Sequence, residues 1–167
     1  MIILIAGTPG VGKTYLASKI ASSLGIPCFN AHEEAIRMVF VDEKDHIRNA
    51  DVIDEEKVED IIVDLKNKNA DFVFEGLLSH YANPQNDRLC IIIKCDIKTL
   101  NQRLIDRGYS REKIRENIDS EIFQIIENEA VEQGHKIIVF DNTDSSEKEI
   151  DSLLSKIKDF QDNISSK

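Results

Sequence analysis

The feature that most constrains the fold is a glycine-rich stretch with the sequence GTPGVGKT at residues 7–14. It matches the phosphate-binding pattern G-x-x-x-x-G-K-[ST]. The unbroken apolar run before it, residues 1–6, predicts a buried strand, and Leu16, Ile20 and Leu24 after it have helical spacing. A strand, a glycine loop and a helix in this order form an anion site, because loop N–H groups and the helix start face the phosphate. We therefore expect a protein that binds a nucleoside triphosphate.

Each fixed position of this loop pattern has a chemical reason. Gly7, Gly10 and Gly12 allow the backbone to turn its N–H groups inward, in conformations closed to other residues. Lys13 is expected to reach the β- and γ-phosphates, and the Thr14 hydroxyl to ligate Mg²⁺. The loop thus predicts ATP with Mg²⁺ as its ligand.

Length and composition narrow the class of protein. A chain of 167 residues suits one domain with a sizeable core, and 41% hydrophobic with 31% charged residues is ordinary for a soluble protein. No apolar run approaches the roughly 18 residues of a membrane span, and the first residues lack the basic region of a signal peptide. We expect a cytoplasmic protein without membrane association. The net charge of −10 argues against direct nucleic-acid binding and is compatible with a basic protein partner.

The three cysteines show no metal-ligand spacing. Cys28, Cys90 and Cys95 are therefore expected to be reduced core residues, with Cys90 and Cys95 on opposite faces of their strand.

Apolar periodicity predicts five strands that alternate with helices. The run at residues 89–94 is apolar throughout, which is typical of a parallel strand buried on both faces. The result is an α/β fold, a five-stranded parallel sheet with helices on both faces and ligands at the carboxyl ends of the strands. Strands are expected at residues 1–6, 28–30, 72–75, 89–94 and 136–140. The first helix is expected to follow the glycine loop and to end at residue 24, and further helices are expected at 31–41, 54–69, 98–106, 111–133 and 147–160. The helix 111–133 is expected to carry one apolar stripe of Ile114, Ile118, Ile122, Ile125 and Ile126.

An acidic segment at residues 42–56 interrupts this pattern. It is poor in large apolar residues, and we interpret it as a mobile insertion whose far end caps the next helix through Asp54.

Glu75 is the best candidate for the carboxylate that a phosphoryl-transfer site needs to hold Mg²⁺ or orient water. It closes an apolar strand at the sheet edge where the glycine loop lies. The alternative is a surface glutamate at a strand end. Asp71 lies at the other end of that strand and is expected to be a turn residue.

Cationic side chains are also needed around the charge that develops during transfer. Arg107 is the best placed, because it precedes Gly108 and Tyr109 between two helices, as in a small hinged lid. For each arginine the alternative is that it lies on a solvated helix surface and has no role in the site. The full set of candidates is Arg37, Arg88, Arg103, Arg107, Arg111 and Arg115. Of the four histidines, His32 and His80 are expected near the nucleotide and His46 and His135 on the surface, and none forms a metal cluster.

Three stretches together resemble one known family. They are GTPGVGKT at 7–14, IDEEKV at 53–58, and R-G-Y-x-x-x-K-x-x-x-N-I-x-x-E-I-F from Arg107 to Phe123. On these residues the chain resembles the adenylate kinase isoenzyme 6 family, small nucleoside monophosphate (NMP) kinases of archaea and eukaryotes that are tied to ribosome biogenesis and rRNA processing. The similarity covers essentially the whole chain.

The resemblance implies one domain, residues 1–167, with an NMP-binding segment at about 30–53 and a lid at about 106–116. Arg107 would contact ATP from the lid, and Asn30 and Arg37 would bind the acceptor. Thr14 and Glu75 would hold Mg²⁺, directly or through water. The implied ATP-phosphate contacts are Gly10, Val11, Gly12, Lys13, Thr14 and Tyr15.

The chain departs from the family at two places. Tyr15 stands where the family often has Thr, which leaves only its backbone N–H as a contact. In the family's D-x-H motif, Glu75 takes the place of Asp and Leu77 that of His, with His80 the nearest histidine. The loss of that histidine is expected to weaken ATP hydrolysis more than phosphoryl transfer, which relies on positioning and electrostatics.

The activity expected from this reasoning is a broad-specificity NMP kinase, with some ATPase activity, in which Lys13, Glu75 and Arg107 are the catalytic residues. An alternative is an ATPase-type assembly factor for the small ribosomal subunit that binds a basic ribosomal protein through the acidic segment 42–56. A kinase of a non-nucleotide metabolite is a weaker alternative. A GTPase is the least favoured, because the late strand ends in Asp141-Asn142-Thr143 and not in N-K-x-D.

Overall fold

A computed structural model describes the fold of residues 1–45 and 50–166, and the side chains of residues 1–40 and 54–166. Among these residues, no helix is both long and apolar enough to span a membrane.

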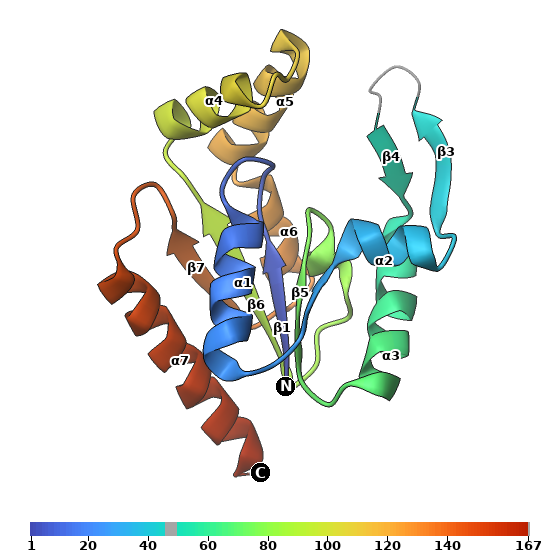
Figure 1. The fold of residues 1–167 in the computed structure, drawn as a ribbon, viewed down its shortest axis with the longest axis vertical. Coiled ribbons are helices and arrows are strands. Elements are labelled where there is room, and N and C mark those ends of the chain that lie inside the picture. Colours follow the sequence, from blue (N-terminus) through green and yellow to red (C-terminus); the bar gives the residue numbers. More distant parts are fainter. Residues whose placement is uncertain (46–49, 167) are drawn as a thin grey trace.

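Five parallel strands form the central sheet, in the order β2-β5-β1-β6-β7 (Figure 1). This confirms the predicted doubly wound α/β fold. Because β1 lies in the middle and the chain adds strands on both of its sides, the loop after β1 lies at the switch point where such sheets bind ligands. The strands are β1 (Ile2–Ala6), β2 (Cys28–Asn30), β5 (Phe72–Glu75), β6 (Arg88–Lys94) and β7 (Ile137–Asp141).

Seven helices surround the sheet in the described part of the chain. They are α1 (Lys13–Leu24), α2 (Ala31–Arg37), α3 (Val58–Lys68), α4 (Ile97–Asp106), α5 (Arg111–Ile122), α6 (Ile125–Glu132) and α7 (Glu147–Ser165). Two short 3-10 turns, Glu55–Lys57 and Ser79–Tyr81, precede α3 and follow β5.

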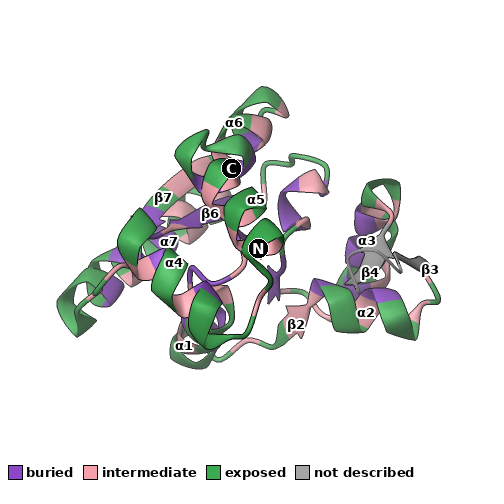
Figure 2. Ribbon diagram, turned by 90° about the horizontal axis from the view of Figure 1, so that it is seen from above, coloured by how far each residue is buried: buried purple, intermediate pink, exposed green. Residues whose placement is uncertain are grey.

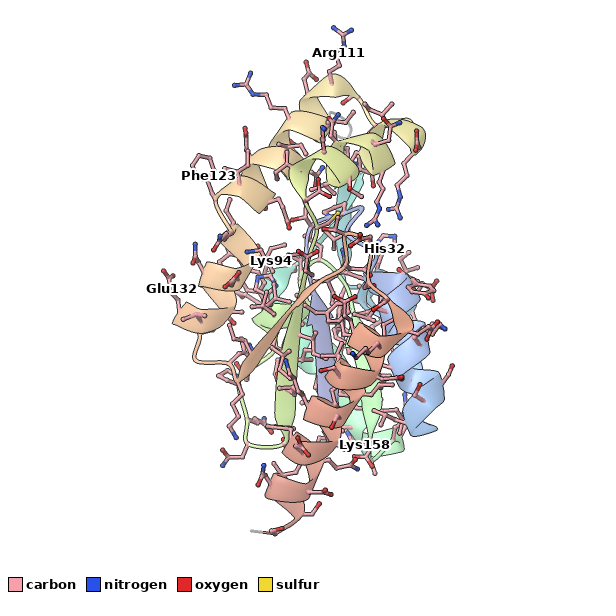
Figure 3. The ribbon with its side chains drawn as sticks, turned by 90° about the vertical axis from the view of Figure 1, so that its left-hand side faces the viewer. His32, Lys94, Arg111, Phe123, Glu132 and Lys158 are labelled. Atoms are coloured by element: carbon pink, nitrogen blue, oxygen red, sulfur yellow. The ribbon has the colours of Figure 1, made fainter. Side chains whose placement is uncertain are left out.

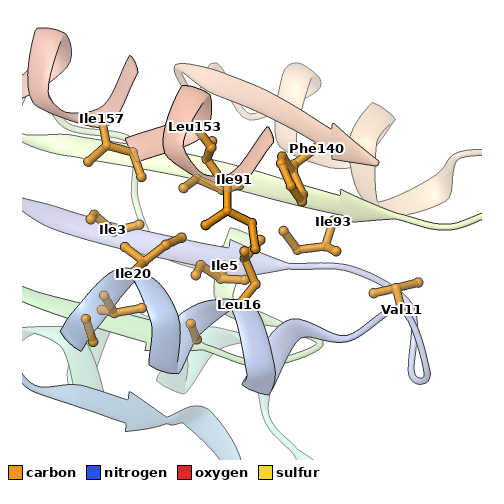
Figure 4. Packing of buried hydrophobic residues seen from close by; sticks show 14 of the residues in the cluster. Ile3, Ile5, Val11, Leu16, Ile20, Ile91, Ile93, Phe140, Leu153 and Ile157 are labelled. Atoms are coloured by element: carbon orange, nitrogen blue, oxygen red, sulfur yellow. The ribbon is translucent and has the colours of Figure 1, made fainter. Parts of the chain in front are cut away.

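Helices cover both faces of the sheet. Side chains alternate along a strand, so Ile3 and Ile5 of β1 enter a core shared with α1, α4 and α7, whereas Ile2 and Leu4 enter a core shared with α2, α3 and α6. Figure 4 shows the first core between α1 and α7, and Figure 2 shows buried residues along the strands and the inner helix faces. Burial on both faces explains why these strands are apolar throughout.

The acidic segment contains regular structure, which the sequence pattern did not predict. Strands β3 (Val41–Asp45) and β4 (Ala50–Ile53) pair as an antiparallel hairpin. Asp54 caps the turn after it as expected, because its Oδ1 accepts from the Glu56 N–H at 2.9 Å. The helix expected at 31–41 ends earlier, at Arg37, because Val39 adopts a positive φ of 60° and the chain turns into β3.

The prediction of a single helix at 111–133 was wrong. The chain breaks at Gln124, whose φ is 53°, and continues as α6. Ile114 and Ile118 pack against the core of α1 and α7, whereas Ile126 belongs to the core on the other face. One straight helix cannot serve both faces, so the predicted isoleucine stripe is divided. The two isoleucines at the junction, Ile122 and Ile125, are exposed.

Two of the three cysteines lie where the sequence predicted. Cys90 and Cys95 are buried in different cores, and burial raises the pKa of the Cys90 thiol to about 12. Cys28 is exposed, which corrects the prediction, because β2 is an edge strand with only β5 beside it. All three thiols are free.

Arg88 was a candidate for phosphate binding, and the structure places it at the opposite end of the sheet. Its side chain is 1% exposed and is held by Glu59, with Nη1 2.6 Å from Oε2 and Nη2 2.9 Å from Oε1. Nη1 also donates to the carbonyl of Asn83 at 2.7 Å. Arg88 thus has a structural role in joining the start of β6 to α3.

We expect Glu59→Ala to lower the free energy of unfolding by about 2 kcal/mol, because it leaves the buried Arg88 charge with a single carbonyl partner. The effect is smaller than for a fully enclosed pair, since the Glu59 side chain is 21% exposed and water can replace part of it. Urea unfolding measures the change. Asp60→Ala is the matched control, because Asp60 pairs with Lys57 only at 3.6 Å on the surface and should change stability by less than about 0.5 kcal/mol. Equal effects of the two substitutions would contradict the role of Arg88.

Candidate active site

The loop between β1 and α1 has a backbone that only glycine permits. Gly12, the residue before α1, has a φ of 99°, and a Cβ atom there would lie 2.2 Å from Nδ2 of Asn142. Gly7 has a φ of 152°, and its Cβ would lie 2.5 Å from the carbonyl oxygen of Ile93. Asn142 also donates to the carbonyl of Val11 at 2.8 Å. The loop is therefore fixed against the ends of β6 and β7, at the carboxyl edge of the sheet.

Lys13 folds back over this loop. Its Nζ donates to the carbonyls of Gly7 at 2.7 Å and Thr8 at 3.2 Å. The pKa of Lys13 is lowered to about 8, mainly by burial and in addition by the positive charge of Arg107, against the attraction of Glu75 and Glu121. An anion bound in the loop would supply the negative charge that this ammonium group lacks.

Glu75 lies beside the loop and is 3% exposed, so it is not a surface residue of the strand end. Its Oε1 accepts from the Thr14 hydroxyl at 3.1 Å and from Nδ2 of Asn30 at 2.6 Å. The register of the sheet explains this arrangement, because Glu75 pairs with Ile5 of β1 on one side and with Asn30 of β2 on the other. Three parts of the chain thus bring polar side chains to one point, and Thr14 and Glu75 each contribute an oxygen atom there.

The oxygen atoms of Thr14 and Glu75 fit a Mg²⁺ site. Mg²⁺ prefers oxygen ligands and is commonly held by one or two protein groups together with water and substrate phosphates. Within the described residues there is no cluster of three or more His, Cys, Asp or Glu side chains that would form a self-sufficient metal cage. The residues present thus suit a metal that arrives with its nucleotide.

A cavity of about 570 Å³ opens above the loop and Glu75. Asn30 forms part of its wall and also caps α2, since its Oδ1 accepts from the N–H groups of His32 and Glu33. Figure 1 shows the arm of α4 and α5 on one side above the loop and the β3–β4 hairpin on the other. The lining residues are Pro9, Gly10, Gly12, Lys13, Thr14, Tyr15, Asn30, Ala31, His32, Glu75, Gly76, Leu77, Leu78, Arg107 and Tyr109.

A second cavity of about 360 Å³ adjoins the first and shares Gly10, Gly12, Tyr15 and Arg107 with it. Its remaining lining residues are Arg103, Asn142, Thr143, Asp144 and Ser145. The two cavities therefore lie next to each other at the loop, with Asn30 in the wall of the first and Asn142 in the wall of the second. A nucleotide with its phosphates on the loop has space on both sides.

Arg107 lies at the end of α4, where Gly108 turns the chain with a φ of 73°. It lines both cavities. Arg103, one turn earlier, has a different task. Its guanidinium donates to the carbonyls of Asn142 and Thr143 at 3.1 and 3.0 Å and also reaches the loop carbonyls. Arg103 therefore holds the backbone segments that form the wall of the second cavity, whereas Arg107 is exposed and available to a ligand.

Other residues predicted for the site lie elsewhere. Arg37 forms ion pairs with Glu34 at 2.6 Å and Asp64 at 2.7 Å and does not line the cavity. Val11 offers only its backbone, because its side chain is buried in the core. Arg111 lies at the far tip of the α4–α5 arm (Figure 3), and Arg115 pairs loosely with Asp119 at 3.8 Å. The acceptor role of Arg37 stays a prediction.

The histidines are distributed differently from the expectation. His32 lines the cavity as predicted. His80 is 1% exposed and lies outside the cavity, with its Nε2 2.9 Å from Oε2 of Glu129. His135, expected on the surface, is buried and has its Nε2 2.7 Å from the carbonyl of His80. Burial lowers the pKa of both buried histidines. His46 lies outside the described residues.

Sequence reasoning missed Asn142 as a residue of the site. The available signal was its place directly after the last strand, because residues at the carboxyl ends of parallel strands meet at one edge. Tyr109, Leu77 and Leu78 also line the cavity without having been singled out for it. Their positions depend on the turns after α4 and β5, which no sequence periodicity describes.

Comparison with known proteins gives consistent results. A family profile described as "AAA domain" matches residues 3–124. A protein of Thermococcus kodakarensis named "Putative adenylate kinase" is 35% identical over 150 residues, which cover 90% of this chain and 81% of the relative. The "Adenylate kinase isoenzyme 6 homolog" of Drosophila melanogaster is 34% identical over 140 residues, 83% of this chain and 79% of the relative.

The fold is also similar to solved structures of kinases. The crystal structure of a shikimate kinase from Bacteroides thetaiotaomicron superposes with a TM-score of 0.61 and covers 97% of this chain and 98% of its own. At 14% identity this likeness concerns the fold alone. The sequence relatives, by contrast, span most of both chains, and the residues matched by the family profile include the glycine loop described above. The chain therefore belongs to the adenylate kinase isoenzyme 6 family of P-loop kinases.

Proposed function

We propose that this protein is a cytoplasmic, broad-specificity NMP kinase, which transfers the γ-phosphoryl group of ATP–Mg²⁺ reversibly to AMP or another NMP. The observation that carries the proposal is that Lys13, Glu75, Arg107 and the start of α2 all line one cavity. A donor site alone would need only the loop and its cation. The additional space between Asn30 and Tyr109 is suited to a second substrate, and the family relationship supports a nucleotide as that substrate.

In this proposal the triphosphate of ATP lies on the loop, with Lys13 at the β- and γ-phosphates. The base and ribose occupy the second cavity beside Asn142, and the acceptor occupies the first cavity beside Asn30 and His32. Bound Mg²⁺, held from Thr14 and Glu75, would neutralise charge on the β- and γ-oxygens. Arg107 then approaches the transferring group from the side opposite the loop.

The chain's own groups act mainly by position and charge, because phosphoryl transfer demands little covalent chemistry from the protein. Lys13 and Arg107 stabilise negative charge on the transferred group from two directions. Closure of the arm that carries Arg107 would exclude water and so favour transfer to the acceptor phosphate over hydrolysis. Leu77, an apolar residue in the cavity wall, adds no group that could activate water there.

An ATPase-type assembly factor is the second candidate. The observation in its favour is the acidic segment at residues 42–56, which includes the β3–β4 hairpin that stands beyond α2, on the other side of the molecule from α4 (Figure 1). A basic protein, such as one of the small ribosomal subunit, has the complementary charge. In that case ATP turnover would be slow, indifferent to NMPs and stimulated by the partner.

The test is ADP formation from ATP–Mg²⁺ with and without each of AMP, CMP, GMP and UMP. The kinase proposal predicts two diphosphates per ATP consumed, in proportion to the acceptor supplied, and a rank order among the four acceptors. Phosphate release that is equal in all five reactions would contradict the kinase proposal and favour the assembly ATPase.

A further inference from the structure

A buried carboxylate lies beneath the phosphate-binding loop, outside both cavities. Glu121, in the last turn of α5, is 9% exposed. Its Oε2 accepts from the hydroxyl of Thr8 at 2.7 Å, and its Oε1 accepts from the backbone N–H of Cys95 at 3.1 Å. Neither oxygen faces a substrate. The carboxylate instead connects three separate segments of the chain.

Each partner of Glu121 belongs to a part of the site that must be placed accurately. Thr8 lies in the loop, is 2% exposed, and its carbonyl accepts from the Nζ of Lys13 at 3.2 Å. Cys95 follows β6 and lies two residues before α4, which ends at Asp106, next to Arg107. Glu121 itself lies just before the break at Gln124. The arm of α4 and α5 therefore leaves the sheet after Cys95 and ends near Gln124, and Glu121 joins these two ends of the arm to the loop.

Packing alone does not explain a carboxylate at this position. A buried carboxylate costs several kcal/mol unless hydrogen bonds compensate for the lost water, and an apolar residue would fill the space without that cost. The neighbouring lysine, Lys94, does not compensate, because it donates to Glu127 at 2.8 Å. The two hydrogen bonds to Thr8 and Cys95 are thus the interactions that distinguish Glu121 from a leucine.

We propose that Glu121 is a positioning residue of the phosphoryl-transfer site. Its carboxylate holds Thr8 against the base of the α4–α5 arm, so that the loop with Lys13 and the arm with Arg107 keep a fixed spacing. This inference rests on the proposed function. In this role Glu121 does not contact the substrate and does not transfer a proton. Its effect on the reaction passes through Thr8, and this dependence makes it testable.

The test is a double-mutant cycle on kcat with ATP and the best acceptor. Glu121→Ala and Thr8→Val are each expected to lower kcat about tenfold, since small displacements of catalytic groups cost up to about 10²-fold, with KM for ATP changed less than about threefold. The double variant should also lose about tenfold and not about 100-fold, because both substitutions remove one interaction. Glu121→Gln should retain kcat within about threefold, since its amide can donate to the Thr8 oxygen and still accept from Cys95.

Matched variants separate positioning from folding. Glu127→Gln changes a neighbouring glutamate that accepts a hydrogen bond from Lys94, and it should leave kcat unchanged. Combined with Thr8→Val, it should give the same kcat as Thr8→Val alone. If Glu121→Ala does not fold, a comparison of kcat between Thr8→Val and Thr8→Ser still tests the proposal. Only serine keeps the hydroxyl that donates to Glu121, so only Thr8→Val should lower kcat. Wild-type kcat in Thr8→Val, or a fully additive cycle, would overturn the proposal. If the wild-type protein phosphorylates no NMP, the proposed function fails, and the same cycle is then measured on the rate of ATP hydrolysis, with the same non-additivity expected.

Discussion

Lys13→Ala should lower phosphoryl transfer by about 10³-fold or more while the protein remains folded. The Lys13 ammonium is the one cation in the glycine loop, and loss of a group that stabilises transition-state charge costs on the order of 10²–10³-fold even for a neutral donor. Folding should not suffer, because burial already disfavours this ammonium, as its lowered pKa shows. Steady-state kinetics and thermal unfolding measure the two effects.

Lys19→Ala is the matched control for Lys13→Ala. Lys19 lies on the same helix, pairs with Glu147 at 3.0 Å on the surface, and lines neither cavity. Its removal should leave the rate unchanged. Near-normal turnover in Lys13→Ala would mean that the loop does not hold the triphosphate in the way described.

Glu75→Gln should lower kcat by about 10²-fold and raise the Mg²⁺ concentration needed for half-maximal rate. Glutamine preserves the size of the side chain and can still accept from Asn30 and Thr14, so the fold and the cavity wall should persist. What is lost is the negative charge that suits a divalent cation at this point. The measurement is kcat over a range of Mg²⁺ concentrations, together with the unfolding temperature.

Glu33→Gln is the control for this substitution, since Glu33 is an exposed glutamate on the neighbouring helix α2. It should change neither kcat nor the Mg²⁺ dependence. If Glu75→Gln behaved in the same way, Glu75 would be reduced to a buried strand-end residue that bonds Asn30 and Thr14 for structural reasons alone.

The parts of the site that the sequence predicted are those fixed by local rules. A glycine loop between an apolar strand and a helix has few conformations, and Gly12 shows why, since any Cβ would collide with Asn142. The position of Glu75 follows from the rule that parallel strands end at one edge, which places it beside Thr14 and Asn30. The sheet and its two helical layers follow from strands that are apolar throughout.

The parts that the sequence did not predict depend on partners distant along the chain. Arg88 and His135 are polar residues that normally lie on the surface. Their burial is compensated by hydrogen bonds, from Arg88 to Glu59 and the carbonyl of Asn83 and from His135 to the carbonyl of His80. The helix break at Gln124 arises because the chain crosses from one core to the other, which no single periodicity describes. Glu121 was visible only as part of a family motif, and its bond to Thr8 spans 113 positions.

The most direct test of the kinase account is to supply the protein with ADP and Mg²⁺ alone and to measure ATP and AMP. An NMP kinase that accepts AMP has two nucleotide sites and catalyses a reversible transfer, so ATP and AMP should appear in equal amounts, and Lys13→Ala should produce neither. An ATPase can only consume ATP. Failure to form any ATP from ADP, in a preparation that hydrolyses ATP, would contradict the adenylate kinase-like reaction proposed for this site.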